Sequence, residues 1–114
     1  MQQSRDDNLG REGRLFERRR TRLRPVKLAA LTRKFIDEGT MFDRSKGGAR
    51  IRRQTGRALP QRFLVLDEIE MTFLPVAIVW VNGFEVGVRF VGTEIQPNQA
   101  EIRRLTGRYY ALPE

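Results

Sequence analysis

Residues 76–90 read VAIVWVNGFEVGVRF, which is two apolar runs joined by Asn82 and Gly83. An Asn-Gly pair between two such runs is the strongest short signature of a β-hairpin, because a type I′ turn needs positive φ at both central residues. In the second run, apolar side chains alternate with polar residues or glycine, as in a strand with one buried face. We therefore predict a hairpin whose second strand turns these residues toward the core: Phe84, Val86, Val88 and Phe90.

Two residues of this hairpin carry further information. Gly87 lies in mid-strand, where a glycine indicates either a β-bulge or the close approach of another group to the backbone. Trp80 is the only tryptophan of the chain, and we expect it to pack inside the barrel that the strands form. Stacking against a nucleotide base is the alternative role for this side chain.

Strand patterns continue on the N-terminal side of the hairpin. The apolar or alternating stretches are residues 26–30, 34–42, 49–52, 63–66 and 71–74. Within the second stretch we expect Asp37-Glu38-Gly39 to form a turn. The acidic residues at 67–70 are interpreted as a solvated face between two apolar runs. Short, closely spaced strands of this kind are typical of a small antiparallel barrel.

The C-terminal part of the chain has a helical pattern. Asn98 is a suitable N-cap, Glu101 completes a capping box at the third helical position, and Gly107 is a suitable end. Residues 1–17 show no sustained periodicity and are predicted to be a flexible N-terminal arm. The expected fold is therefore mainly β, a six-stranded antiparallel β-barrel with a C-terminal α-helix.

The composition restricts the function. The 114 residues include 22 Lys and Arg, 14 Asp and Glu, and neither cysteine nor histidine. Disulfides, thiolate chemistry and the commonest general base and metal ligand are excluded, so we expect no catalysis, no metal and no cofactor. No apolar run approaches the roughly 20 residues of a membrane span, and the charged N-terminus is unlike a signal peptide, so we expect a cytoplasmic protein. A net charge of +8 indicates an anionic partner.

Two motifs are candidates for binding that partner. The pattern Arg-x-x-x-Arg occurs twice, as Arg18 with Arg22 and as Arg20 with Arg24. Leu23 directly follows the first pair, which favours it, whereas the regular alternation begins only at Val26, nearer the second pair. Both registers therefore stay open. The second motif is Asp-x-Ser-x-x-Gly, which comprises Asp43, Ser45 and Gly48.

The order of these motifs, followed by a Trp-containing strand and the Gly87–Phe90 ending, resembles the PilZ domain family of bacterial cyclic di-GMP receptors. The resemblance covers residues 17–92. It implies a split-barrel fold with a helix after it, and it implies cyclic di-GMP as the ligand. It divides the chain into an arm at 1–17, a barrel domain with an N-terminal arginine switch at 18–96, and a helix and tail at 97–114.

The chemistry of the ligand suits the motif residues. Arginines at positions 18, 20, 22 and 24 can donate two hydrogen bonds to guanine O6 and N7 or pair with a phosphate. Asp43 can accept from the guanine N1–H and amino group, and Ser45 can bond a base or a phosphate. Gly48 lacks a Cβ and therefore permits a close approach of ligand and backbone.

Two other functions remain possible. A small basic RNA- or single-strand-DNA-binding barrel explains the charge without any motif, although its binding face normally presents several aromatic residues. Here Phe63, Phe84 and Phe90 are expected to face the core. The other possibility is a PilZ-like domain that has lost nucleotide binding and serves as a protein-interaction module. For the receptor we expect an unidentified downstream protein effector and a monomer or weak dimer.

Overall fold

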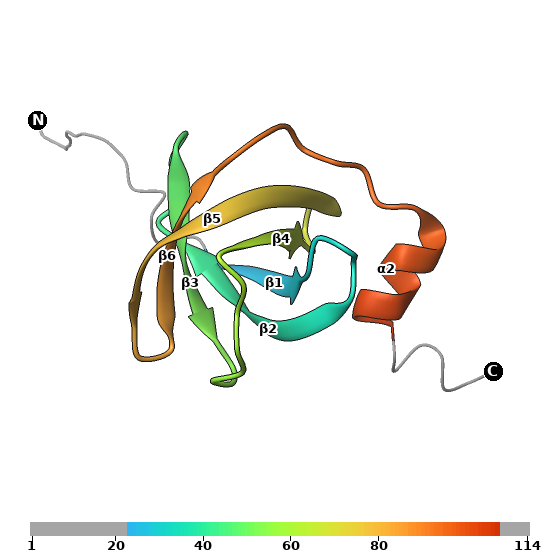
Figure 1. The fold of residues 1–114 in the computed structure, drawn as a ribbon. Helices are drawn as coiled ribbons and strands as arrows, with labels where there is room; N and C mark the ends of the chain where they lie inside the picture. Colours follow the sequence, from blue (N-terminus) through green and yellow to red (C-terminus); the bar gives the residue numbers. More distant parts are fainter. Residues whose placement is uncertain (1–22, 108–114) are drawn as a thin grey trace, which may run out of the picture.

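The computed structural model describes residues 23–107, which form a closed six-stranded antiparallel β-barrel followed by one helix (Figure 1). The elements are β1 (Arg24–Ala29), β2 (Phe35–Phe42), β3 (Gly48–Arg53), β4 (Arg62–Asp67), β5 (Thr72–Asn82), β6 (Glu85–Phe90) and α2 (Gln99–Thr106). The strand order around the barrel is β1-β2-β3-β6-β5-β4. The predicted mainly-β barrel with a C-terminal helix is confirmed, whereas the predicted arm at 1–17 lies outside the described residues.

The barrel interior is filled by alternate residues of every strand. On β3, for example, Ala49 and Ile51 are buried while Arg50 and Arg52 point outward, as the alternation predicted. This interior cluster consists of Val26, Leu28, Met41, Ala49, Ile51, Phe63, Val65, Leu74, Val76, Val86 and Val88. It is the main hydrophobic core of the described domain.

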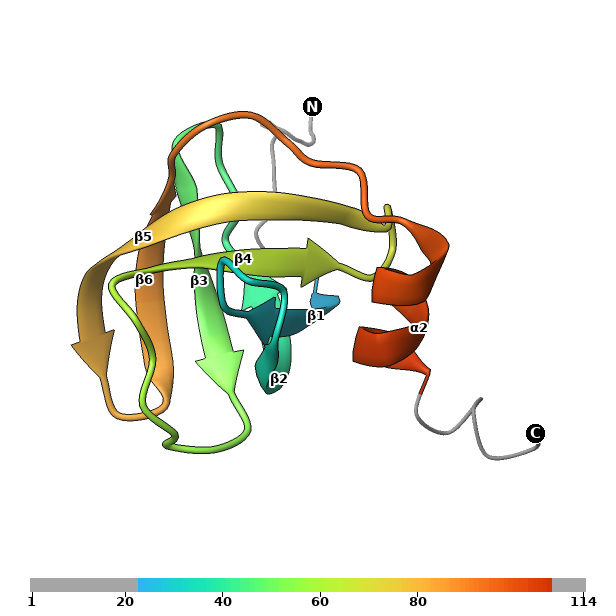
Figure 2. The same cartoon turned by 45° about the vertical axis from the view of Figure 1, so that its right-hand side comes forward.

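The helix α2 lies beside the barrel (Figure 2). A second cluster of buried residues joins the outside of the barrel to this helix. It consists of Ala29, Leu64, Leu66, Phe73 and Leu105. The helix begins with the predicted capping box, in which Asn98 accepts from the Glu101 amide and Glu101 accepts from the Asn98 amide. Because β4 is buried on both faces, its apolar residues run consecutively instead of alternating. The described residues include no helix that is both long and apolar enough to cross a membrane.

The hairpin of β5 and β6 forms, but its turn differs from the prediction. Asn82 pairs with Glu85, so the two turn residues are Gly83 and Phe84. Only Gly83 has positive φ, at 64°, which is the φ pattern of a type II′ turn and not of type I′. Phe84 is 57% exposed, so its predicted place in the core was wrong. The predicted alternation of inward and outward residues along the strand is correct, but Phe84 lies beyond the end of the barrel.

The predicted turn at Asp37-Glu38-Gly39 was also wrong, because these residues lie inside β2. Asp37 is buried, at 2% exposure, and its carboxylate is fully used. Its Oδ2 accepts from Arg53 Nε at 3.0 Å and from Thr55 Oγ1 at 3.0 Å, while its Oδ1 accepts from the Glu38 amide at 2.8 Å. These contacts stabilise an aspartate within a strand and fix the loop that follows β3.

Candidate functional site

Two arginines from different parts of the chain meet at one rim of the barrel. Arg24, the first residue of β1, donates from Nη1 to Asp67 Oδ2 at 2.9 Å. Arg44, in the turn between β2 and β3, donates to the same oxygen at 3.4 Å. The segment that precedes β1 therefore joins the barrel beside the turn that carries the Asp-x-Ser-x-x-Gly motif.

Asp67 is what holds this rim together. It is 1% exposed, so the interpretation of the acidic stretch as a solvated face was wrong for this residue. While Oδ2 binds the two arginines, Oδ1 accepts from the amides of Ile69 and Glu70 at 2.9 and 3.3 Å and shapes the turn into β5. Arg24 and Arg44 keep 17% and 30% of their side-chain surface exposed. Arg24 also donates from Nη2 to Glu70 Oε2 at 3.5 Å, so Arg44 is the arginine of this rim that is more available to an anion in solvent.

The turn between β2 and β3 is built by the motif residues themselves. Asp43 adopts φ 52°, in the left-handed region that Asp tolerates better than most residues. The Ser45 amide donates to the Gly48 carbonyl at 2.8 Å, and the Ser45 hydroxyl accepts from the amides of Gly47 and Gly48 at 3.2 and 3.3 Å. Ser45 therefore shapes the turn and remains exposed.

Gly48 is required for a reason that the sequence did not reveal. A Cβ at this position would collide with the backbone carbonyl of Val88 on the neighbouring β6. The φ angle of Gly48 is not positive. The need for glycine therefore comes from the packing of β3 against β6, and the predicted role in ligand approach stays a prediction.

Asp43 faces the outer surface of β3 and not the arginine pair. Its Oδ2 lies 3.2 Å from Arg50 Nε, and 29% of its side chain is exposed. Arg50 also approaches Glu85 at 3.7 Å, and its guanidinium lies 5.6 Å from the centre of the Phe42 ring. Asp43 and Arg24 make no direct contact, and Arg44 is the residue that links the motif turn to Asp67.

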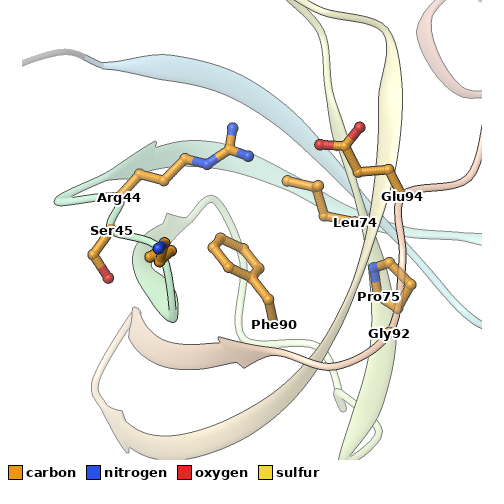
Figure 3. Close-up of a pocket in the computed structure, with 8 residues that line it drawn as sticks. Arg44, Ser45, Leu74, Pro75, Phe90, Gly92 and Glu94 are labelled. Carbon is orange, nitrogen blue, oxygen red and sulfur yellow. The ribbon is translucent and has the colours of Figure 1, made fainter.

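A pocket of about 280 Å³ opens beside this turn (Figure 3). Arg44 and Glu94 point toward the same space from opposite walls, and the Arg44 guanidinium lies 5.4 Å from the centre of the Phe90 ring. The full lining is Arg44, Ser45, Lys46, Leu74, Pro75, Phe90, Gly92 and Glu94. The pocket thus combines an aromatic and aliphatic floor with two cations.

Sequence reasoning missed Arg44 and Phe90 as site residues. For Arg44 a signal existed, because it occupies the variable position between Asp43 and Ser45 and so shares their turn. Of the predicted arginines, Arg24 lies at the rim, whereas Arg18, Arg20 and Arg22 lie outside the described residues. The choice between the two arginine registers therefore stays open.

The outer face of the sheet carries a second group of exposed residues. Trp80 is 40% exposed and lies outside the core, so the prediction that it packs inside the barrel was wrong. Its indole covers Gly87, where a Cβ would collide with the indole ring. Gly87 pairs with Arg50 of β3 and is flanked on β6 by Arg89, which is exposed. The predicted close approach at Gly87 is confirmed, and the approaching group is this indole.

A lysine network connects the Asp67 turn to β2. The Lys27 ammonium lies 2.6 Å from Glu68 and 3.3 Å from Glu38. Burial alone would lower the pKa of Lys27, but the two carboxylates outweigh burial and raise it above the ordinary value of 10.5. Lys27 is therefore charged at neutral pH and serves the fold of this rim.

Comparison with known proteins gives no assignment of this site. No protein family, no curated protein and no solved structure matches the chain. The geometry of the rim and of the outer face is therefore the basis on which a function is inferred.

Proposed function

We propose that the chain is a cyclic di-GMP receptor whose nucleotide binds at the rim formed by the β2–β3 turn and the start of β1. One observation carries this proposal: Arg24 and Arg44 converge on the single oxygen Asp67 Oδ2. The convergence supports a site in which residues just before β1, including Arg22, reach a ligand held at the motif turn. The pairing of Arg44 with Asp67 leaves further guanidinium donors of Arg44 for a phosphate or a guanine.

The charges at this rim favour an anionic ligand that carries an aromatic base. Arg44 and the exposed Lys46 stand at the pocket, and Phe90 supplies an apolar surface beside Arg44. A cyclic dinucleotide brings two phosphates and two purines, so it can use both the cations and the apolar surface. Glu94 on the opposite wall disfavours a simple polyanion in the pocket itself.

In this proposal, the carboxylate of Asp43 recognises the guanine. Its carboxylate is partly exposed and binds Arg50 at 3.2 Å. A guanine Watson–Crick edge offers two donors to the same carboxylate, and Arg50 keeps Glu85 as a second partner when Asp43 turns to the ligand. Adenine has an acceptor at N1 and no amino group at C2, so it cannot donate this pair of hydrogen bonds, and the difference would give the site its selectivity.

Calorimetric titration of the full chain with cyclic di-GMP tests the proposal. We expect saturable binding in the micromolar range or tighter, and much weaker binding of GTP and cyclic di-AMP. In this proposal the nucleotide-bound protein acts as an adaptor. The segment that carries Arg18, Arg20 and Arg22 closes over the nucleotide, and this closure changes the surface that a downstream protein can bind. Equal binding of all three nucleotides would remove the basis for a guanine dinucleotide site.

Variants sharpen this titration. D43A and R22A should each cost about 1–3 kcal/mol of binding free energy, the usual contribution of a bidentate or charge-assisted contact. The matched control is R62A, which removes the same charge from an exposed residue at the start of β4 that makes no ion pair within residues 23–107. If R62A weakens binding as much as R22A does, the arginine contribution is general electrostatics and not a site.

A second candidate function, binding of single-stranded nucleic acid, has its own observation in the outer-face residues. Trp80 lies exposed over Gly87, whose neighbours on β3 and β6 include Arg50 and Arg89, and a stacking platform with cations is the combination that such proteins use. For this function, an oligonucleotide should bind with a steep salt dependence, weakened by W80A and R89A and unchanged by D43A. Binding that is weakened by D43A and unchanged by W80A and R89A supports the dinucleotide receptor instead.

A further inference from the structure

The segment that follows β6 forms one wall of the pocket beside the β2–β3 turn. The Val91 amide donates to the Pro75 carbonyl at 2.9 Å, and Phe73 and Ile95 exchange both of their backbone hydrogen bonds at 2.9 Å. Glu94 lies between these two anchor points, so the wall that carries it is tied to β5 at both ends.

The opposite wall is held in place as well. The Phe90 amide donates to the Gly47 carbonyl at 2.9 Å, which joins the β2–β3 turn to the end of β6. Arg44 on this turn binds Asp67 through Nη1. The other donors of its guanidinium group are therefore available to a group in the pocket.

Opposite charges face each other across the pocket without forming an ion pair. Arg44 and Glu94 point toward the same space (Figure 3). Among residues 23–107, Arg44 pairs with Asp67 alone and Glu94 takes part in no ion pair. A ligand placed between them can accept from Arg44 and donate to Glu94 at the same time. An ionised phosphate oxygen can only accept, so the carboxylate of Glu94 repels it.

The rest of the pocket suits the faces of one flat ring system. Leu74, Pro75 and Phe90 supply apolar surface alongside the two charged walls. The volume of about 280 Å³ is just below the range of about 300–1,000 Å³ that is typical of pockets for whole small ligands. The pocket therefore admits a single base and not a complete cyclic dinucleotide.

We propose that this pocket holds one guanine base, with Glu94 accepting from its N1–H and C2 amino group and Arg44 donating to its O6 and N7. Guanine carries two acceptors on one edge and two donors on the next edge, which matches a cation on one wall and a carboxylate on the other. Adenine has an acceptor at N1 and an amino donor beside N7, so it fits neither wall. The link to cyclic di-GMP rests on the proposed function, in which Asp43 recognises one guanine and this pocket takes the other.

The sign of the E94Q effect distinguishes base recognition from general electrostatics. If Glu94 only repels an anionic nucleotide, removal of its charge should strengthen binding. If Glu94 accepts from guanine, E94Q should weaken the binding of cyclic di-GMP about tenfold in calorimetric titration of the full chain. The matched control is E101Q on α2, which removes the same charge and keeps the capping box, because glutamine also serves at this position. We expect E101Q not to weaken binding.

Mononucleotides test the pocket separately from the dinucleotide. GMP and AMP carry the same ribose and phosphate, so a difference between them reports the base. In NMR titrations of the ¹⁵N-labelled full chain with millimolar nucleotide, GMP should shift the backbone amides of Gly92, Thr93 and Glu94 much more than AMP does. E94Q should abolish this preference for GMP.

The two experiments separate failure of this inference from failure of the proposed function. If the wild type binds cyclic di-GMP and E94Q binds it equally well or more tightly, the guanine pocket is overturned and the receptor function stands. Equal shifts with GMP and AMP at Gly92 to Glu94, or no shifts with either, also overturn the pocket. A chain that binds no cyclic di-GMP but prefers GMP to AMP at these amides overturns the proposed function and supports guanine recognition in the pocket.

Discussion

Two buried aspartates, Asp37 and Asp67, hold arginines at different places on the barrel, and they differ in how far those arginines remain accessible. The partner of Asp37 is Arg53, of which only 8% is exposed. Asp67 has two arginine partners, Arg24 and Arg44, and these are 17% and 30% exposed. The two carboxylates themselves are equally buried, at 2% and 1%.

The difference separates a structural contact from a binding site. Arg53 also donates to the Arg57 carbonyl at 2.6 Å, so its guanidinium is committed to the loop after β3. The arginines of Asp67 share one oxygen at 2.9 and 3.4 Å and face solvent beside a pocket. A buried, saturated ion pair stabilises a loop, whereas the partly exposed Arg44, which shares its carboxylate with Arg24, keeps guanidinium donors for an anion.

The largest effect is expected from D37N. Loss of this charge leaves Arg53 buried without its carboxylate, and breaking a buried pair in this way costs about 3–5 kcal/mol. Urea unfolding of the full chain measures the change in the free energy of unfolding. A loss below about 1 kcal/mol would mean that Asp37 behaves like a surface ion pair, and the contrast between the two aspartates would disappear.

D67N should have a smaller effect on stability, of about 1–3 kcal/mol, because Arg24 and Arg44 can turn to solvent when the charge is lost. The same urea unfolding experiment makes the comparison, since the substitution and the depth of burial are matched. If D67N destabilises the protein more than D37N, the Asp67 rim is a structural element and its arginines are not available to a ligand.

R44A should separate binding from stability. Because Arg44 is 30% exposed, we expect its loss to change the free energy of unfolding by less than about 1 kcal/mol. Cyclic di-GMP binding should weaken by about 1–3 kcal/mol, as expected for a charge-assisted contact. Calorimetry measures the binding free energy, and urea unfolding of the same preparation measures the free energy of unfolding. Unchanged binding in R44A would remove Arg44 from the proposed site.

The smallest effect concerns Lys27, which links the surroundings of the two aspartates through Glu38 and Glu68. Its pKa is raised above 10.5 in the folded protein, so its stabilising contribution is complete below the unfolded value and is lost as the pH rises through the folded value. Stability relative to K27M should therefore fall as the pH rises above 10.5. The measurement is the free energy of unfolding as a function of pH. If the curves of the wild type and K27M run parallel above pH 10.5, the stabilising contribution assigned to charged Lys27 is contradicted.

Local patterns in the sequence predicted most of the fold. The alternation on β3, the hairpin of β5 and β6 and the Asn98–Glu101 capping box each depend on residues close together in the chain, and each is present. Trp80 shows why a single irregularity matters. The bulge between Ile78 and Trp80 shifts the parity of β5 by one residue, so the tryptophan points outward and not into the core.

The candidate site was less predictable because its contacts join distant residues. Asp67 binds Arg44 and Arg24, which are 23 and 43 positions away in the sequence, and no local pattern marks an acidic residue in a strand as buried. Gly48 was singled out for the approach of a ligand, which stays a prediction, and not for packing. Its contact with the Val88 carbonyl of β6 depends on strand order, which the sequence did not specify.

An NMR titration of the ¹⁵N-labelled full chain with cyclic di-GMP tests the central claim most directly. The account predicts saturable shifts of the backbone amides of Asp43 to Gly48 and of Arg24, with smaller changes around Trp80 and none at the Asp37–Arg53 pair. An unchanged spectrum at millimolar nucleotide would contradict the account. Shifts confined to the outer face around Trp80 and Arg89 would contradict it equally and would favour single-stranded nucleic acid as the ligand.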